Sequence, residues 1–215
     1  PTACGWSPGG DIVFSSQLIP MIAIRVADGT SRPLTRTRLS GDVGRYDFGG
    51  FLPDGTRFVF RVAGGNAGGI YVGDLDDRDD PILLPDTQGT GIPLYAHGHL
   101  LWATERVLWA RPFDAAKLAF TGEARSLSPH LGGNNRHGFS TSMTVPPTMV
   151  VSSDATITIQ ATLEVRDRQG RSKRTLAQDA VSFSIAPNGS TIAIARAGGV
   201  WVADLERSAP VRMTG

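Results

Sequence analysis

The sequence predicts an all-β protein built from repeated small sheets, because one pattern occurs five times and no stretch shows sustained helical periodicity. In the clearest copies, a Pro/Gly turn at residues 7–10, 52–55 or 186–189 is followed at once by an alternating strand. Two degenerate copies begin at residues 95 and 145, so successive turns are 45, 43, 50 and 41 residues apart. A period of about 40 to 50 residues built only from strands is typical of the four-stranded blades of a β-propeller.

We therefore expect a β-propeller segment of about five four-stranded blades. The expected blades span approximately residues 1–38, 39–86, 87–131, 132–178 and 179–215. The chain begins before an inner strand and ends after an outer one, so no terminal strand is spare to complete another blade. We expect these residues to form an incomplete ring, part of a propeller with about six to eight blades.

The last copy shows the expected order of strands within one blade. Val181, Phe183 and Ile185 alternate with serines, which predicts a strand with one apolar face. Pro187 presets φ for a type I turn and Gly189 closes that turn, so the chain reverses there. Further strands are expected at residues 191–196, 200–205 and 211–214. If Gly189 has a positive φ, a valine in its place would strain the backbone.

The composition excludes several classes of protein. With 40% hydrophobic and 19% charged residues, the 215-residue chain is typical of globular proteins and not of disordered ones. The net charge of +1 gives no overall field that would attract nucleic acid. The most apolar stretch, residues 18–27, contains Pro20 and Arg25 and is too short to span a membrane. Cys4 is the only cysteine, so no internal disulfide is expected, and the start at Pro1 favours a piece of a longer protein.

Several segments resemble known propeller repeats. The turns at residues 6–9, 51–55 and 185–189 resemble the W-S-P-D-G turn of TolB-like, WD-repeat-like propellers. More specifically, some segments are similar to the propeller that lies C-terminal to the kinase domain in many bacterial receptor-type serine/threonine kinases; they are residues 51–58, 96–102, 110–114, 118–123 and 167–171. This resemblance implies a sensor or interaction module in the periplasmic or extracellular part of a membrane-anchored bacterial protein. The chain departs from the pattern at Gly9, at residues 146–148 and at Glu164.

Residues that could suggest chemistry lack the partners that such sites need. His97 and His99 lie on a turn with no third ligand near in sequence, and the aspartates of residues 74–80 lack the glycine and closing glutamate of a calcium loop. Residues 64–69 lack the Lys-Ser/Thr of a phosphate loop, and residues 138–142 lack the second glycine of a nucleophile elbow. The remaining groups that could be assembled with a serine into a triad are His130, His137, Asp154 and Asp167. We expect no metal, no cofactor and no catalysis in this segment.

The expected binding surface lies where the chain passes from one blade to the next. These connections, at residues 39–45, 86–93, 131–138 and 178–180, should all return to the same face and ring the mouth of the channel. The candidate binding residues are Arg45, Tyr46, Asn134, Asn135, Arg136 and His137. Arg and Tyr are enriched among binding hot spots. We expect a non-catalytic module that binds a protein or small molecule and neither nucleic acid nor membrane. The alternative is the propeller lid of a prolyl-oligopeptidase-like hydrolase whose catalytic domain lies outside this segment.

Overall fold

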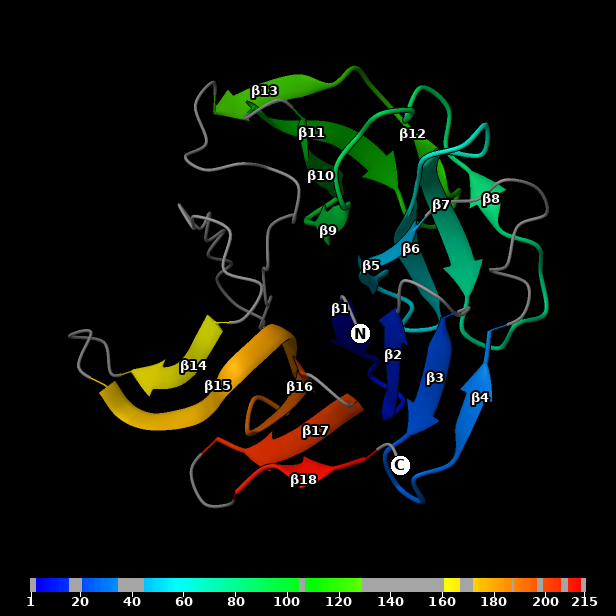
Figure 1. The fold of residues 1–215 in the computed structure, drawn as a ribbon. Coiled ribbons are helices and arrows are strands. Elements are labelled where there is room, and N and C mark those ends of the chain that lie inside the picture. The colour runs from blue at the N-terminus through cyan, green and yellow to red at the C-terminus, as the bar shows by residue number, and fades with distance from the viewer. Residues whose placement is uncertain are drawn as a thin grey trace.

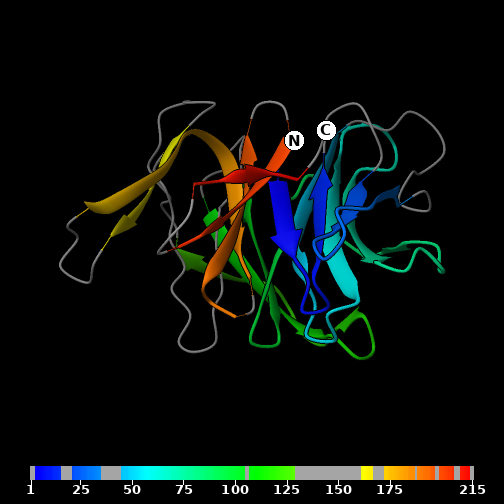
Figure 2. The same ribbon diagram turned by 90° about the horizontal axis from the view of Figure 1, so that it is seen from below.

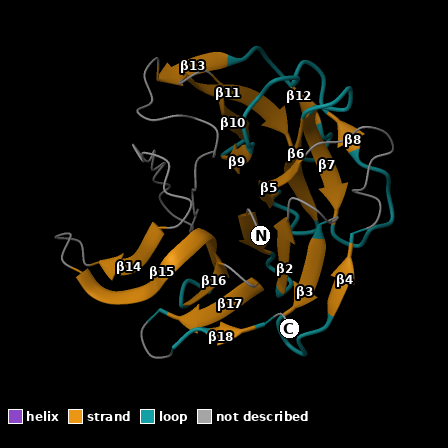
Figure 3. Cartoon of the chain, viewed as in Figure 1, coloured by secondary structure: helices purple, strands orange, loops and turns teal. Residues whose placement is uncertain are grey.

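The computed structural model describes residues 3–15, 21–34, 45–104, 107–128, 161–166, 172–186, 188–196, 199–205 and 209–213. In these ranges every regular element is a β-strand, as Figure 3 shows, and every pairing between strands is antiparallel. The predicted all-β class is confirmed.

The strands form four sheets, numbered here in chain order. Sheet 1 contains β1 (Ala3–Trp6), β2 (Asp11–Ser15), β3 (Ile22–Arg25) and β4 (Ser31–Pro33). Sheet 2 contains β5 (Arg45–Phe51), β6 (Arg57–Ala63), β7 (Gly69–Asp74) and β8 (Ile82–Leu83). Sheet 3 contains β9 (Leu94–Ala96), β10 (His99–Thr104), β11 (Val107–Asp114), β12 (Ala119–Phe120) and β13 (Arg125–Ser128). Sheet 4 contains β14 (Ala161–Arg166), β15 (Ser172–Ile185), β16 (Thr191–Arg196), β17 (Gly199–Asp204) and β18 (Val211–Arg212).

The four sheets lie like sectors around a common centre. In Figure 1, β1, β5 and β9 are nearest the middle, whereas β4, β8, β13 and β18 lie at the outside. The first and last sheets of the chain are neighbours, because β1 contacts both β15 and β16. Figure 2 shows from below how sheet 4 and sheet 1 stand side by side. The described part is therefore an incomplete propeller in which the sheets follow one another in the order 4, 1, 2, 3.

The Pro/Gly turns were predicted from the repeat, and three of them have the same hydrogen bond. In each, the amide of the fourth residue donates to the carbonyl of the first: Gly10 to Ser7 at 3.1 Å, Gly55 to Leu52 at 3.0 Å, and Gly189 to Ala186 at 2.9 Å. The φ values of these glycines are +89°, +72° and +70° respectively, in the left-handed region that favours glycine. The positive φ on which the Gly189→Val prediction depends is therefore present.

Apolar side chains fill the space between neighbouring sheets. The core between sheets 1 and 2 is rich in aromatic rings, and its members include Val13, Met21, Phe48, Phe58 and Phe60. The core between sheets 2 and 3 includes Val59, Ile70, Leu100, Trp102 and Phe113. The core between sheets 4 and 1 includes Ile12, Phe14, Ile24, Ala193 and Val200. These three cores fix the order of the sheets, because each contains buried side chains from both neighbours.

Two faces remain that do not pack on another described sheet. One is the second face of sheet 3, whose buried cluster consists of Ala96, Leu101, Ala103, Leu108 and Ala110. The other is the second face of sheet 4, with Leu176, Ala177, Ala180, Ile192, Ile194 and Ala203. Each cluster is confined to one sheet among the described residues, so these are the two ends of the arc.

Sheet 4 differs from the sequence expectation at one connection. Residues 178–180 were predicted to join two blades, but they lie inside the continuous strand β15. The first half of β15 pairs with β14 and the second half with β16, and Ala180 pairs with both. Ala180 therefore has a strand partner on each side, and no glycine or proline interrupts β15. The strands of sheet 4 come from the expected fourth and fifth blades, and the blade boundaries themselves stay a prediction. The turn copy at residues 145–148 lies outside the described residues.

Candidate functional site

Two of the predicted binding residues, Arg45 and Tyr46, begin strand β5. Successive side chains of a strand point to opposite faces, so the two do not share a surface. Tyr46 is 7% exposed and belongs to the core between sheets 1 and 2, where its ring lies 6.4 Å from that of Phe60. Arg45 lies on the other face of β5. Asn134, Asn135, Arg136 and His137 lie outside the described residues. The predicted site thus stays a prediction, of which the structure places Arg45 and Tyr46.

Arg45 is part of a compact charged cluster on sheet 2. Its Nε lies 2.8 Å from Oδ1 of Asp47, and its Nη2 donates to Oδ2 of the same carboxylate at 3.1 Å. Arg61, which faces Asp47 across the β5–β6 pairing, donates from Nη1 to that Oδ2 at 3.3 Å. Two guanidinium groups therefore share one carboxylate. We call Arg45 and Arg61 the arginine pair of sheet 2.

The environment of this cluster is half-buried. The side chain of Asp47 is 2% exposed, whereas those of Arg45 and Arg61 are 26% and 23% exposed. Burial lowers the pKa of Arg61; the negative charge of Asp47 opposes this shift, and the positive charge of Arg45 adds to it. The cluster carries two positive charges against one negative charge. A guanidinium has five N–H donors and a carboxylate about four acceptor sites, so Asp47 alone leaves donors of the arginine pair unused.

The connection at residues 86–93 approaches the same strand. The carbonyl oxygen of Pro93 comes so close to β5 that a Cβ on Gly49 would lie 2.2 Å from it. Two buried threonine hydroxyls hold this connection in place. The Thr87 hydroxyl donates to the carbonyl of Leu84 at 2.7 Å and accepts from the amide of Ile70 at 2.9 Å. Thr90 donates to the carbonyl of Thr87 at 2.6 Å. The connection between sheets 2 and 3 is thus an ordered loop that reaches β5 at Gly49.

A second Asp–Arg pair occupies a similar place in sheet 4. Nε of Arg196 lies 2.8 Å from Oδ1 of Asp179 and donates to Oδ2 at 3.1 Å. The guanidinium carbon of Arg196 also lies 4.7 Å from the centre of the Trp201 ring, a cation–π contact. Here one cation meets one anion, so no surplus charge results.

The sequence analysis missed Asp47, Arg61, Asp179 and Arg196. A signal was present, since each pair places an Asp before and an Arg after a Pro/Gly turn of the repeat. In both sheets the pair joins the strand before the turn to the strand after it, at the far end of that hairpin. Comparing the copies of the repeat for charged positions would have found them.

The other segments examined in the sequence have ordinary structural roles. His97 and Gly98 form the tight β9–β10 turn, with φ values of +43° and +76°, and the Nδ1 of His99 lies 3.0 Å from the carbonyl oxygen of His97. The carboxylate of Asp74 accepts hydrogen bonds from the amides of Asp76 and Arg78, at 3.1 and 3.2 Å, which closes the acidic turn. Residues 64–68 form the predicted hairpin between β6 and β7. Across the described ranges, no three His, Cys, Asp or Glu side chains gather as metal ligands would.

The described residues contain no helix that is long and apolar enough to cross a bilayer.

Comparison with known proteins gives a fold-level similarity. No protein-family model and no curated protein matches the chain. TolB from Acinetobacter baumannii matches with a TM-score of 0.47 and 15% identity, over 95% of this chain and 51% of TolB. A chain of the Mitotic Checkpoint Complex matches with a TM-score of 0.40 and 10% identity, over 97% of this chain and 48% of the other. The chain thus spans about half the length of these solved chains. At such TM-scores the similarity carries no argument about function, and the incomplete propeller rests on the four sheets themselves.

Proposed function

We propose that the chain is a non-catalytic β-propeller module that binds a protein or a small molecule through the end of sheet 2 where the arginine pair lies. The observation that supports a binding role is the surplus positive charge of that pair around Asp47. Since Asp47 is almost fully buried, its carboxylate is committed to the two arginines, whereas each arginine keeps part of its surface in solvent. The two guanidinium groups are therefore held in place by the buried Asp47 carboxylate, and they offer N–H donors to a ligand.

The chemistry of this site favours an anionic group on the ligand. Guanidinium groups match carboxylates and phosphates through planar, paired hydrogen bonds. A second anion would take up donors that Asp47 leaves unused and would offset the repulsion between Arg45 and Arg61. We propose that the recognised feature is a carboxylate or phosphate of a protein side chain or of a small metabolite.

We further propose that the parent protein is a bacterial receptor-type serine/threonine kinase and that this module lies outside the cytoplasm. This part of the proposal is supported by the resemblance of residues 51–58, 96–102 and 110–114 to the propeller of such kinases. Reading the parent chain tests it directly. A kinase Gly-rich loop and a membrane helix before Pro1 would support the proposal, whereas a G-x-S-x-G elbow after Gly215 would replace it with a hydrolase lid.

The binding role is tested by titration with anions and matched variants. Inorganic phosphate and acetyl-aspartate are titrated against the chain while its thermal unfolding temperature is followed, since a ligand that binds only the folded state raises that temperature. Arg45→Gln should weaken binding by about fivefold or more, as expected for loss of one anchoring cation. Arg57→Gln is the matched control, because Arg57 lies on β6 like Arg61 but at the other end, beside Asp54. If neither anion binds, or if both variants bind alike, the site is not at the arginine pair.

A further inference from the structure

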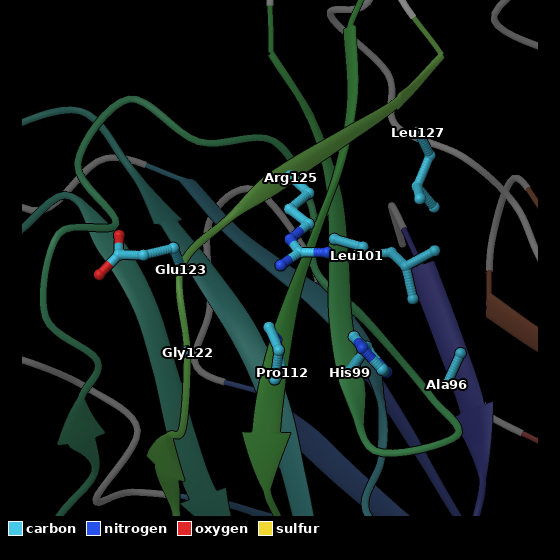
Figure 4. Close-up of a pocket in the computed structure, with 9 residues that line it drawn as sticks. Ala96, His99, Leu101, Pro112, Gly122, Glu123, Arg125 and Leu127 are labelled. Atoms are coloured by element: carbon cyan, nitrogen blue, oxygen red, sulfur yellow. The ribbon is translucent and has the colours of Figure 1, made fainter.

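The second face of sheet 3 carries a pocket that is separate from the arginine pair. Its volume is about 490 Å³, and Figure 4 shows the side chains around it. The residues that line it are Ala96, His99, Leu101, Ala110, Pro112, Gly122, Glu123, Arg125 and Leu127. Small-molecule sites in proteins have volumes of about 300 to 1,000 Å³, and most are apolar with a few polar groups. This pocket has both properties.

The pairing of three strands brings these side chains onto one face. His99 pairs with Pro112 and Leu101 pairs with Ala110 across β10 and β11, and Ala110 in turn pairs with Arg125 on β13. Directly paired residues point to the same side of a sheet. The surface is hollow at Ala110 because its side chain is a single methyl group, whereas the neighbouring side chains of Leu101 and Arg125 are larger. The hollow is therefore a consequence of residue size along regular strands.

One rim of the pocket is fixed by bonds made from Arg111. Its Nε donates to the carbonyl of Gly122 at 2.9 Å, and its guanidinium carbon lies 4.1 Å from the centre of the Phe120 ring. The amide of Thr121 also donates to the carbonyl of Pro112 at 3.0 Å. The segment that joins β12 to β13 is thus held against β11. A ligand would meet a rim that is already formed.

Two charged side chains line the pocket, Glu123 and Arg125. Within the described part of the chain, the Arg125 side chain makes no ion pair or side-chain hydrogen bond, and Figure 4 shows the Glu123 carboxylate directed away from the Arg125 guanidinium. The Nδ1 of His99 is engaged with the His97 carbonyl, which leaves its Nε2 for another partner. Leu127, which also lines the pocket, is 57% exposed. A cation without a counter-ion therefore stands beside apolar surface that is in contact with water.

We propose that this pocket binds a small monocarboxylate with an apolar body, such as a medium-chain aliphatic acid. The carboxylate would pair with Arg125, and the apolar body would cover Leu101, Ala110 and Leu127. Burial of that surface supplies the main attraction, and the ion pair selects the acid over neutral molecules of the same size. A neutral apolar surface of a protein would fit the floor but would leave Arg125 without a partner.

The test compares octanoate with octanol on the whole chain by ligand-observed NMR titration. Octanoate should bind with a dissociation constant on the order of 1 mM, as expected for ten non-hydrogen atoms in an open pocket. Octanol should bind about fivefold more weakly, which is the range expected for an exposed ion pair. Equal binding of the acid and the alcohol, or no binding of the acid, would overturn the proposal.

Three variants decide which group is responsible. Arg125→Gln should lower octanoate affinity to that of octanol and leave octanol binding unchanged. Leu127→Gln should weaken both ligands, because it removes apolar surface and keeps the cation. Arg78→Gln is the control, since Arg78 is an exposed arginine of the acidic turn in sheet 2. All three side chains are exposed, so each variant should fold. Thermal unfolding of each variant checks this. If octanoate binds Arg125→Gln as it binds the unchanged chain, the pocket does not recognise the carboxylate.

Discussion

The contact between sheets 2 and 3 can be tested at two adjacent glycines of β5. A Cβ on Gly49 would lie 2.2 Å from the carbonyl oxygen of Pro93 and 3.0 Å from that of Val59, whereas the nearest atom to a Cβ on Gly50 would be Cδ1 of Leu94 at 3.8 Å. The first two neighbours are backbone atoms that cannot rotate away. Gly49→Ala must therefore move β5 away from the start of sheet 3, while Gly50→Ala fits the existing space.

The magnitudes follow from this difference in space. Forcing extra atoms into a filled site costs about 1 to 3 kcal/mol, which is the expected loss of unfolding free energy for Gly49→Ala. Gly50→Ala should be neutral or should stabilise the chain by up to about 0.5 to 1 kcal/mol, because glycine in a strand is less favourable than alanine. Urea unfolding followed by tryptophan fluorescence measures both, with Trp102 and Trp109 reporting on sheet 3. If the two variants unfold within about 0.5 kcal/mol of each other, Pro93 does not approach β5 as described.

Three further predictions concern Gly189, Arg61 and Asp114. Gly189→Val should lower the unfolding free energy by about 1 to 3 kcal/mol through backbone strain alone, since no atom lies within 4 Å of its Cβ position; Gly189→Asn should lose less, and equal losses in a urea titration would contradict this. Arg61→Gln should cost about 1 to 3 kcal/mol, because Asp47 keeps only one cation in a buried site, and thermal unfolding against Arg57→Gln checks this. Hydrogen bonds from the amides of Lys117 and Ala116 lower the pKa of Asp114, so its stabilising effect is present above about pH 4 and is lost as the pH falls through the folded pKa. The stability difference between the chain and Asp114→Asn should therefore shrink on acidification, and a gap that stays constant from neutral pH to about pH 2 would show that the charge is not involved.

The repeat could be predicted from the sequence because its turns depend on local chemistry. Proline and glycine at fixed places set φ for the reversal, and the apolar alternation after each turn sets the following strand. The hydrogen bonds of Gly10, Gly55 and Gly189 have the same pattern for this reason. Strand β15 was not foreseen, because its length depends on two neighbours that pair with it in succession, β14 and β16. No local signal in residues 178–180 tells whether a second strand is there to pair with them.

The candidate site was only partly accessible from sequence. Arg45 could be named from its residue type and its place in the expected connection at residues 39–45, although the structure has it as the first residue of β5. A comparison of the repeat copies would have singled out Asp47 and Arg61 as charged positions, but not their contact, because Asp47 faces Arg61 only in the observed register of β5 and β6, which includes a shift between Phe48 and Gly50. One residue of slip would exchange the faces of the strand. Replacing an ordinary surface arginine with alanine changes stability by no more than about 0.5 kcal/mol. The contact with the buried Asp47 carboxylate changes that expectation to a loss of about 1 kcal/mol.

Comparison among the sheets shows which of the two arginines around Asp47 is part of the repeated pattern and which is additional. The first strands of sheets 1 and 3, β1 and β9, contain no charged residue, so a sheet of this type forms without an ion pair on its first strand. Sheet 4 has a balanced pair, Asp179 with Arg196. Sheet 2 has the corresponding pair, Asp47 with Arg61, and in addition Arg45. A sheet of this kind therefore needs at most one arginine to pair with its aspartate. Arg45 is a second arginine beside Asp47, and the fold does not require it. Removing Arg61 should act mainly on stability, and removing Arg45 mainly on the binding of anions.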